Sequence, residues 1–268
     1  MAFLSIVSIM LIGSCQSSPE ALSRRKRQAQ GNIEPVTFKT VVKSETVPLS
    51  PDPGYEGSRM LIIMSIQNIP SRGKLGDLIR NTIFNGIDPE EYGEKIIAGY
   101  RSQYQEEGKQ SLAEGGVPSE SWNWEYSETV EGTEITPERA ISGINRCFVI
   151  YKSREYYLGG AHGMREKRYF LFDTVKGKRI GLDELIQKNV RMTLRRLIAA
   201  KLRVHAGLEE NAPLSQGGFF TDLPEIPDNF FLTSNGLGFH WDPYEIAPYV
   251  MGSVEIIIPY DELMDVLR

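Results

Sequence analysis

The stretch INRCFVIYKSREYYLGGAHGMREKRYFLF, residues 144–172, decides the fold. Its β-branched and aromatic residues gather at 144–157 and again at 169–172, and the glycine-rich segment 159–163 lies between them. Side chains of these kinds favour strands, and glycines between two such runs indicate a tight connection. We therefore expect two neighbouring strands joined at residues 159–163.

The segments before this stretch add further strands and two helices. Strand composition occurs at residues 36–47, 60–69 and 121–131. In the last of these, Trp122, Trp124 and Tyr126 alternate with polar residues, so one face of the strand is aromatic. Apolar residues at helical spacing predict one helix from residue 75 to Gly86 and another that Asp88 caps.

The segments after it predict a long helix, a hairpin and a closing helix. Asp183 can cap a helix that ends before Gly207, with an apolar stripe of period 3.6 facing a sheet. Asn235-Gly236 is a strong hairpin signal between residues 230–233 and 237–241. A strand at residues 254–258 and a helix at residues 260–267 complete the chain.

Strands grouped in runs with helices between the groups indicate an α+β fold. We expect largely antiparallel sheets covered by a few helices, with a long amphipathic helix in the C-terminal half. The predicted organisation is a leader at 1–14, a tether at 15–35, an N-terminal α+β module at 36–172 and a C-terminal domain at 173–268 packed on it.

The leader is apolar as far as Gly13, which is too short for a transmembrane helix. It ends in Ile12-Gly13-Ser14-Cys15, which resembles the lipobox of bacterial lipoproteins, and an ordinary secretory signal peptide is the alternative. The first reading makes Cys15 the lipidation site and a lipid bilayer the first partner. The expected location is the cell envelope, at the outer membrane or periplasmic face if the cell is double-membraned.

Composition and charge exclude other classes of function. Residues 1–34 carry four basic and two acidic residues, so the remainder has a formal net charge of −7. An acidic body without a stacking motif argues against nucleic-acid binding.

With Cys15 lipidated, only Cys147 remains, and its apolar neighbours favour a buried, inert thiol.

The usual motifs for a catalytic nucleophile, zinc or phosphate are missing from the sequence, and we expect no cofactor and no metal. The three histidines are His162, His205 and His240. His205 lies at the C-terminal end of the long predicted helix, where a protonated ring would suit the helix dipole. We therefore assign it a structural role. A hydrolase in which His162, His240 and Asp242 cooperate is the enzymatic alternative.

The connection at residues 159–163 favours a structural role for its histidine. Gly159, Gly160 and Gly163 can take positive φ and allow close backbone approach, so they form a structural turn. His162 should then hydrogen-bond locally and hold the turn.

Two blocks, at residues 156–186 and 235–263, resemble the extracellular domain of RsiV-like anti-sigma factors. The shared features are a Gly-Gly-Ala-His segment between strands, a Phe-Asp strand end before a Gly-Lys turn, and a late P-Y-E-I-A-P-Y segment. The chain departs from the family pattern at Asp242, where Asn is common, and at Val250, where Ala is usual.

The resemblance implies one of three architectures: an anti-sigma factor, a polysaccharide deacetylase or a free-standing lipoprotein. The short leader and the end of the chain at Arg268 favour the lipoprotein. We therefore expect a non-catalytic envelope binding module whose ligand is lysozyme or a cell-wall glycan. Besides the hydrolase, a purely structural role in envelope assembly is the remaining alternative. The candidate ligand-binding residues are Tyr157, His162, His240, Tyr244 and Tyr249.

Overall fold

The computed structural model describes residues 38–50, 56–115, 122–138, 141 and 143–268. The predicted leader, Cys15 and the tether lie outside the described residues. The contacts group Thr37–Arg268 into a single compact unit.

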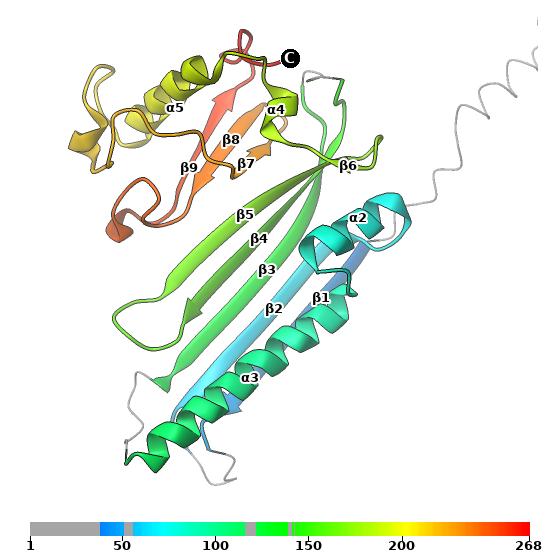
Figure 1. Ribbon diagram of the computed structural model, residues 1–268, viewed down its shortest axis with the longest axis vertical. Coiled ribbons are helices and arrows are strands. Elements are labelled where there is room, and N and C mark those ends of the chain that lie inside the picture. Colours follow the sequence, from blue (N-terminus) through cyan, green and yellow to red (C-terminus); the bar gives the residue numbers. More distant parts are fainter. Residues whose placement is uncertain (1–37, 51–55, 116–121, 139–140, 142) are drawn as a thin grey trace, which may run out of the picture. The chain divides into compact units, whose positions relative to one another are not determined.

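The larger of two sheets has six strands in the order β1-β2-β3-β4-β5-β6 (Figure 1). They are β1 (Phe38–Pro48), β2 (Arg59–Pro70), β3 (Trp124–Ile135), β4 (Cys147–Tyr157), β5 (Met164–Asp173) and β6 (Lys178–Arg179). β2 and β3 are parallel, and every other neighbouring pair is antiparallel. The α+β class and the strand pair on either side of residues 159–163 are thereby confirmed.

Two helices, α2 (Gly73–Ile83) and α3 (Pro89–Ala113), cover one face of this sheet (Figure 1). The Asp88 side chain caps α3 by accepting a hydrogen bond from the Glu90 backbone N–H, as its sequence predicts. Residues of β2 at alternate positions point under these helices and are completely buried: Met60, Ile62, Met64 and Ile66.

A buried charge cluster joins α3 to the sheet. The Glu128 carboxylate is 0% exposed and lies 3.1 Å from Lys152 Nζ and 2.9 Å from Arg154 Nε. It also accepts hydrogen bonds from the hydroxyls of Tyr92 and Tyr126. Burial raises the pKa of Glu128, but Lys152 and these hydrogen bonds outweigh burial and lower it.

The smaller sheet consists of β7 (Phe230–Leu232), β8 (Gly236–Trp241) and β9 (Val254–Pro259), all antiparallel. It confirms the hairpin at Asn235-Gly236. Together with α4 (Leu182–Leu185) and α5 (Arg191–His205) it forms a second hydrophobic cluster, which includes Val149 and Leu171 of the larger sheet.

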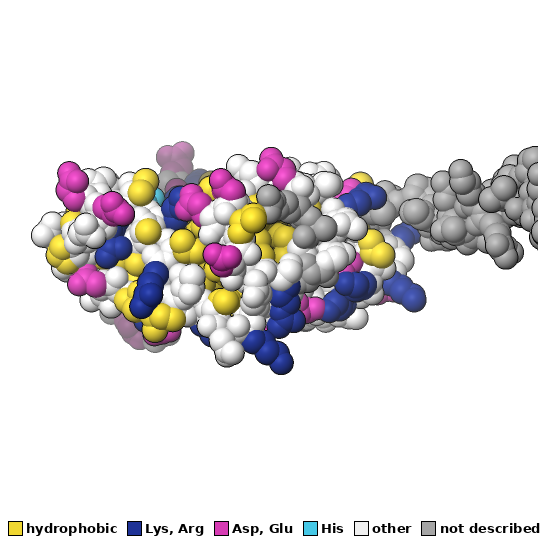
Figure 2. Space-filling view, turned by 90° about the horizontal axis from the view of Figure 1, so that it is seen from above, with side chains coloured by type: hydrophobic (Ala, Val, Ile, Leu, Met, Phe, Trp, Pro, Cys, Tyr) yellow, Lys and Arg dark blue, Asp and Glu magenta, His cyan; other side chains and the backbone are white. Residues whose placement is uncertain are grey.

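Figure 2 shows the molecule from above, where acidic side chains spread over the left and upper part of the view. Lys and Arg side chains gather towards its lower right.

The long predicted helix is two helices instead of one. Chain residues 186–190 separate α4 from α5, because Ile186 forms a β-bridge with Leu267 and the Gln187 N–H donates to the Val266 carbonyl. Asn189, with φ of 67°, turns the chain into α5. The predicted apolar stripe is present on α5, where Leu194, Ile198 and Leu202 are buried.

The predicted closing helix at residues 260–267 is wrong. This segment is a series of turns in which the N–H groups of Leu263 and Val266 bond to carbonyls three residues back. The end of the segment is tied to the chain before α5: Leu267 forms a β-bridge with Ile186, and the Val266 carbonyl accepts from the Gln187 N–H.

The one cysteine of the described residues is Cys147. Cys147 is buried. Burial, and after it the charge of Asp173, raises the pKa of the thiol to about 12, as fits an inert thiol.

In the described part of the chain no helix has the length and apolarity to cross a membrane. The boundary after residue 172 stays a prediction.

Candidate ligand-binding groove

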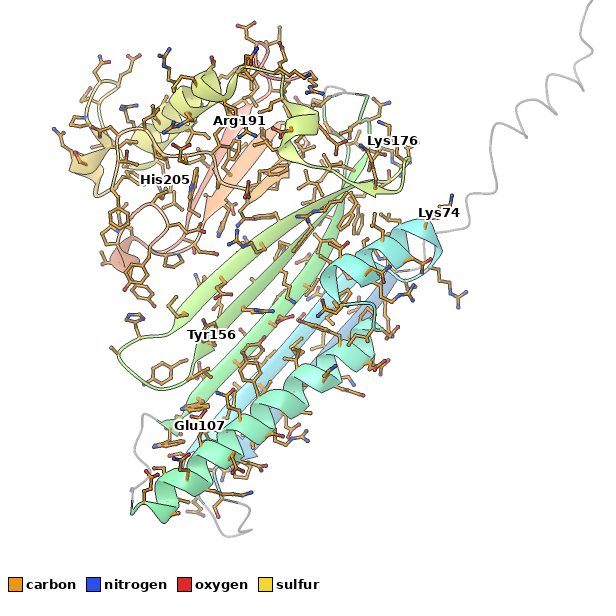
Figure 3. All side chains as sticks on the ribbon, in the orientation of Figure 1. Lys74, Glu107, Tyr156, Lys176, Arg191 and His205 are labelled. Carbon is orange, nitrogen blue, oxygen red and sulfur yellow. The ribbon has the colours of Figure 1, made fainter. Side chains whose placement is uncertain are left out.

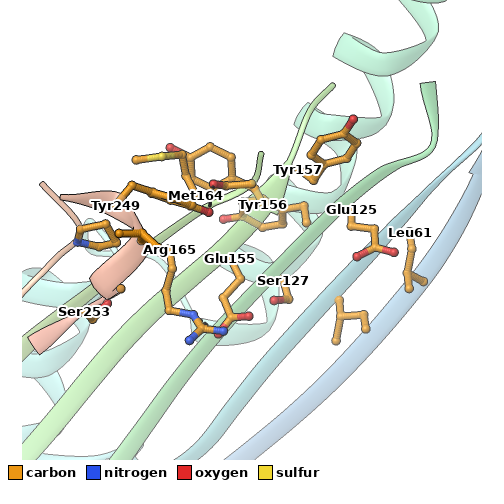
Figure 4. Close-up of a pocket in the computed structure, with 16 residues that line it drawn as sticks. Leu61, Glu125, Ser127, Glu155, Tyr156, Tyr157, Met164, Arg165, Tyr249 and Ser253 are labelled. Carbon is orange, nitrogen blue, oxygen red and sulfur yellow. Dashed lines mark hydrogen bonds and ion pairs between the residues drawn. The ribbon is translucent and has the colours of Figure 1, made fainter. Parts of the chain in front are cut away.

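A groove of about 550 Å³ lies on the open face of the larger sheet, opposite α2 and α3 (Figure 4). The smaller sheet covers only one end of this face. Strands β2, β3, β4 and β5 supply the floor of the groove, and the loop between β8 and β9 supplies a wall. The volume is within the roughly 300–1,000 Å³ of ligand pockets.

Two rows of side chains cross the floor. In the first row, Leu61, Glu125 and Tyr157 are cross-strand neighbours on β2, β3 and β4. In the second row, the neighbours are Ile63, Ser127, Glu155 and Arg165. Each row therefore carries an aliphatic side chain at one end and polar or aromatic side chains at the other.

The floor is partly apolar and partly charged. Leu61 and Ile63 are 38% and 37% exposed, which is unusual for aliphatic side chains inside a strand. The Arg165 guanidinium lies 2.8 Å from the Glu155 carboxylate, and Figure 4 shows the two side by side. Glu125 has no ion-pair partner among the described residues, so the floor carries a net negative charge.

The wall comes from residues 243–253, which contain the short 3-10 helix η3 (Tyr249–Met251). Ser253 lines the groove, yet its Oγ is buried without a hydrogen-bond partner. Among the described residues, Ser253 Oγ is the one buried side-chain oxygen or nitrogen that has no hydrogen-bond partner. Unsatisfied buried groups are rare in folded proteins and call for an explanation.

Two turns distant in sequence meet at the rim of the groove. The His162 ring stacks on the Tyr249 ring, with centroids 4.0 Å apart and planes 24° apart. The Tyr249 hydroxyl donates a hydrogen bond of 2.7 Å to the Gly163 carbonyl. His162 Nδ1 also lies 2.9 Å from the Gly163 carbonyl, so the expected local bond of this histidine is present.

Tyr244 belongs to the same surface. Its ring centroid is 5.6 Å from that of Tyr249, and its side chain is 53% exposed. Its φ of 72° is uncommon for a bulky residue, and strained backbone of this kind tends to occur at functional sites. We call residues 159–163 together with residues 244–249 the two-turn surface.

The glycines of the first turn differ from expectation at one position. Gly159 and Gly160 have φ of 84° and 102°, as predicted. Gly163 does not have positive φ; it is small for a different reason, since a Cβ there would approach the Tyr156 carbonyl oxygen to 3.0 Å.

His240 lies apart from the groove, inside the protein. It is 3% exposed, and its ring nitrogens lie 3.1 Å from Asp242 and 3.1 Å from Glu255. Burial lowers the pKa of His240, but the hydrogen bonds to Asp242 and then Glu255 outweigh burial and raise it. The protonated ring satisfies both carboxylates, because only the imidazolium donates from both nitrogens.

The predicted candidates therefore separate into two groups. Tyr157 and Tyr249 line the groove, and His162 and Tyr244 contact Tyr249. Of the residues in the hydrolase alternative, His240 and Asp242 are in contact, whereas His162 packs on Tyr249. The described residues hold no cluster of three or more side chains suited to a metal ion.

Of the residues on the floor of the groove, sequence reasoning selected Tyr157 and missed the others. Glu125 and Ser127 are the polar residues that alternate with the aromatic residues of β3, so their exposure could have been inferred. Their neighbours Leu61 and Ile63 could not, because the parallel pairing of β2 with β3 leaves no local signal.

The wall of the groove lies in a segment that matches a known family model. Residues 183–261 match the DUF3298 family model. The description of that family is "Protein of unknown function (DUF3298)". The match includes His240, Tyr244, Tyr249 and Ser253, whereas the floor of the groove lies outside it. No curated protein matches the chain.

Solved structures of DUF3298 proteins share the fold. A family member from Bacteroides fragilis has a TM-score of 0.68 at 21% identity, covering 87% of this chain and 93% of its own. A family protein from Pseudomonas aeruginosa has a TM-score of 0.56 at 17% identity, covering 89% and 97%. The likeness thus extends well beyond the segment that the DUF3298 model matches.

Proposed function

We propose that this protein is a membrane-anchored envelope lipoprotein whose folded part is a non-catalytic binding module. Its ligand contacts the two-turn surface. The observation that carries the proposal is the stacking of His162 on Tyr249, which holds two exposed turns in a fixed relation. Rigid aromatic side chains lose little conformational entropy on binding and are frequent at the centres of interfaces.

The ligand class follows from the resemblance to the RsiV-like extracellular domain, whose relatives bind lysozyme. Lysozyme is a small cationic protein, and residues 35–268 carry a formal net charge of −7. Opposite charges accelerate encounter and favour such a partner. The match to DUF3298 supports the same family grouping at a coarser level.

Membrane anchoring rests on Cys15 and the apolar leader, as argued from the sequence. The closed environment of His240 supports binding over hydrolysis, because a general base must reach its substrate.

Surface plasmon resonance tests the proposal. The full chain in mild detergent is passed over immobilised lysozyme at physiological salt, beside a Tyr244→Ala variant and a Val175→Ala control. Val175 is 82% exposed in a turn between β5 and β6, away from the two-turn surface. Binding that Tyr244→Ala weakens and Val175→Ala does not is the expected result. A response equalled by an unrelated acidic protein contradicts it.

A further inference from the structure

We propose that the groove binds a linear glycan whose sugars carry free amino groups, lying across β2, β3 and β4. This inference goes beyond the proposed function, because it concerns the floor of the groove and does not require contact with lysozyme.

The floor matches the two kinds of surface that a sugar presents. The faces of a pyranose ring consist of C–H groups, and its rim carries hydroxyls. Leu61, Ile63 and Tyr157 offer apolar and aromatic surface, whereas Glu125, Ser127 and Glu155 offer acceptors in the adjoining strands. Binding sites of this kind combine an apolar lining with a few placed polar groups.

Charge selects an amino sugar over a neutral one. Glu155 forms an ion pair with Arg165, which neutralises its charge. Glu125 is exposed and has no cationic partner among the described residues. An ammonium group of the ligand next to Glu125 would make a charge-assisted hydrogen bond, which is stronger than a neutral one.

Backbone pairing argues against an extended peptide as the occupant. β2, β3 and β4 each have strands on both sides, so their backbone groups are used in the sheet. On the outer edge of β5, before its short pairing with β6, the N–H groups of Lys167 and Tyr169 donate to the side chains of Asp242 and Asn229. A peptide could not add as a strand here, which removes the main source of affinity for extended peptides.

Ser253 Oγ supplies an independent observation. It is buried without a partner on the wall of the groove, and a ligand hydroxyl would satisfy it after a rotation of the side chain.

Isothermal titration calorimetry on the full chain tests the proposal with a matched pair of probes, a glucosamine hexamer and the corresponding N-acetylglucosamine hexamer. We expect the glucosamine hexamer to bind about tenfold more tightly, because only its amines are cationic. Glu125→Gln should remove this preference. Glu107→Gln, on α3 at the opposite face (Figure 3), should leave it unchanged.

Tyr157→Ala should weaken the binding of both hexamers by loss of the aromatic surface. The proposal is overturned if neither hexamer binds, if Glu125→Gln retains the preference, or if tetralysine binds as tightly as the glucosamine hexamer. Lysozyme binding measured on the same preparations separates the two proposals: lysozyme binding without glycan binding overturns only this inference.

Discussion

The backbone N–H of Lys167 donates a hydrogen bond to Asp242 Oδ1 over 2.8 Å. Lys167 belongs to β5 of the larger sheet, and Asp242 directly follows β8 of the smaller one. The same carboxylate oxygen lies 3.1 Å from His240 Nε2. Asp242 therefore couples the two sheets at the base of the loop that forms the groove wall.

Asp242→Ala should destabilise the protein by about 1–3 kcal/mol, because it leaves the Lys167 N–H without its acceptor and removes a partner of His240. Asp242→Asn should cost less, since its amide oxygen can still accept from Lys167. Urea unfolding of both variants measures the difference. Equal losses would show that the charge, and not the hydrogen bond to Lys167, is what matters.

Stability should fall as pH rises above about 6.5, the ordinary pKa of histidine. The pKa of His240 is raised in the folded protein, so its contribution is fully present below the unfolded pKa and is lost as pH rises through the folded one. Free energies of unfolding across this range measure the effect. The loss should be much smaller in His240→Gln, and parallel curves for the two proteins would contradict the assignment.

Gly160→Val should lower the free energy of unfolding by about 1 kcal/mol or more. Gly160 has φ of 102°, and an added Cβ meets nothing within 4 Å, so the cost comes from the backbone and not from a clash. Gly99→Ala is the control: it lies in the exposed interior of α3, where alanine should stabilise by about 0.5–1 kcal/mol. An unchanged melting temperature for Gly160→Val would show that the positive φ at this position does not require glycine.

Cys15→Ser should move the protein from the membrane fraction to the soluble fraction, because the serine cannot receive the lipid. Ser17→Ala should remain with the membranes. Fractionation and labelling with a radioactive fatty acid measure the two effects. A wild-type chain that takes up no label would refute lipidation.

Local patterns predicted most of the elements of the fold. β-branched composition located β1, β2 and β4, and the Asp88 cap located the start of α3. Errors arose where distant segments decide the backbone. Residues 186–190 have helical periodicity, but the bridge between Ile186 and Leu267 holds them out of a helix.

The candidate site was predictable on its rim, but only at Tyr157 on its floor. The two turns carry recognisable glycines, prolines and tyrosines. Their contact through His162 and Tyr249 is a tertiary contact, which local sequence patterns do not reveal. His240 was selected because carboxylates follow it closely in sequence, yet Glu255, its second partner, comes from the neighbouring strand.

The parallel pair of β2 and β3 in the larger sheet governs the order in which the chain can fold. Met60 lies opposite Trp124, and both α2 and α3 come between them in the chain. Closing so long a segment costs entropy before any contact repays it, and such non-local pairing slows folding. A chain that emerges from its N-terminus first can form the β1–β2 hairpin early, but the second edge of β2 stays open until β3 arrives. During that interval an apolar strand is available to other chains, and protection from aggregation is then needed most.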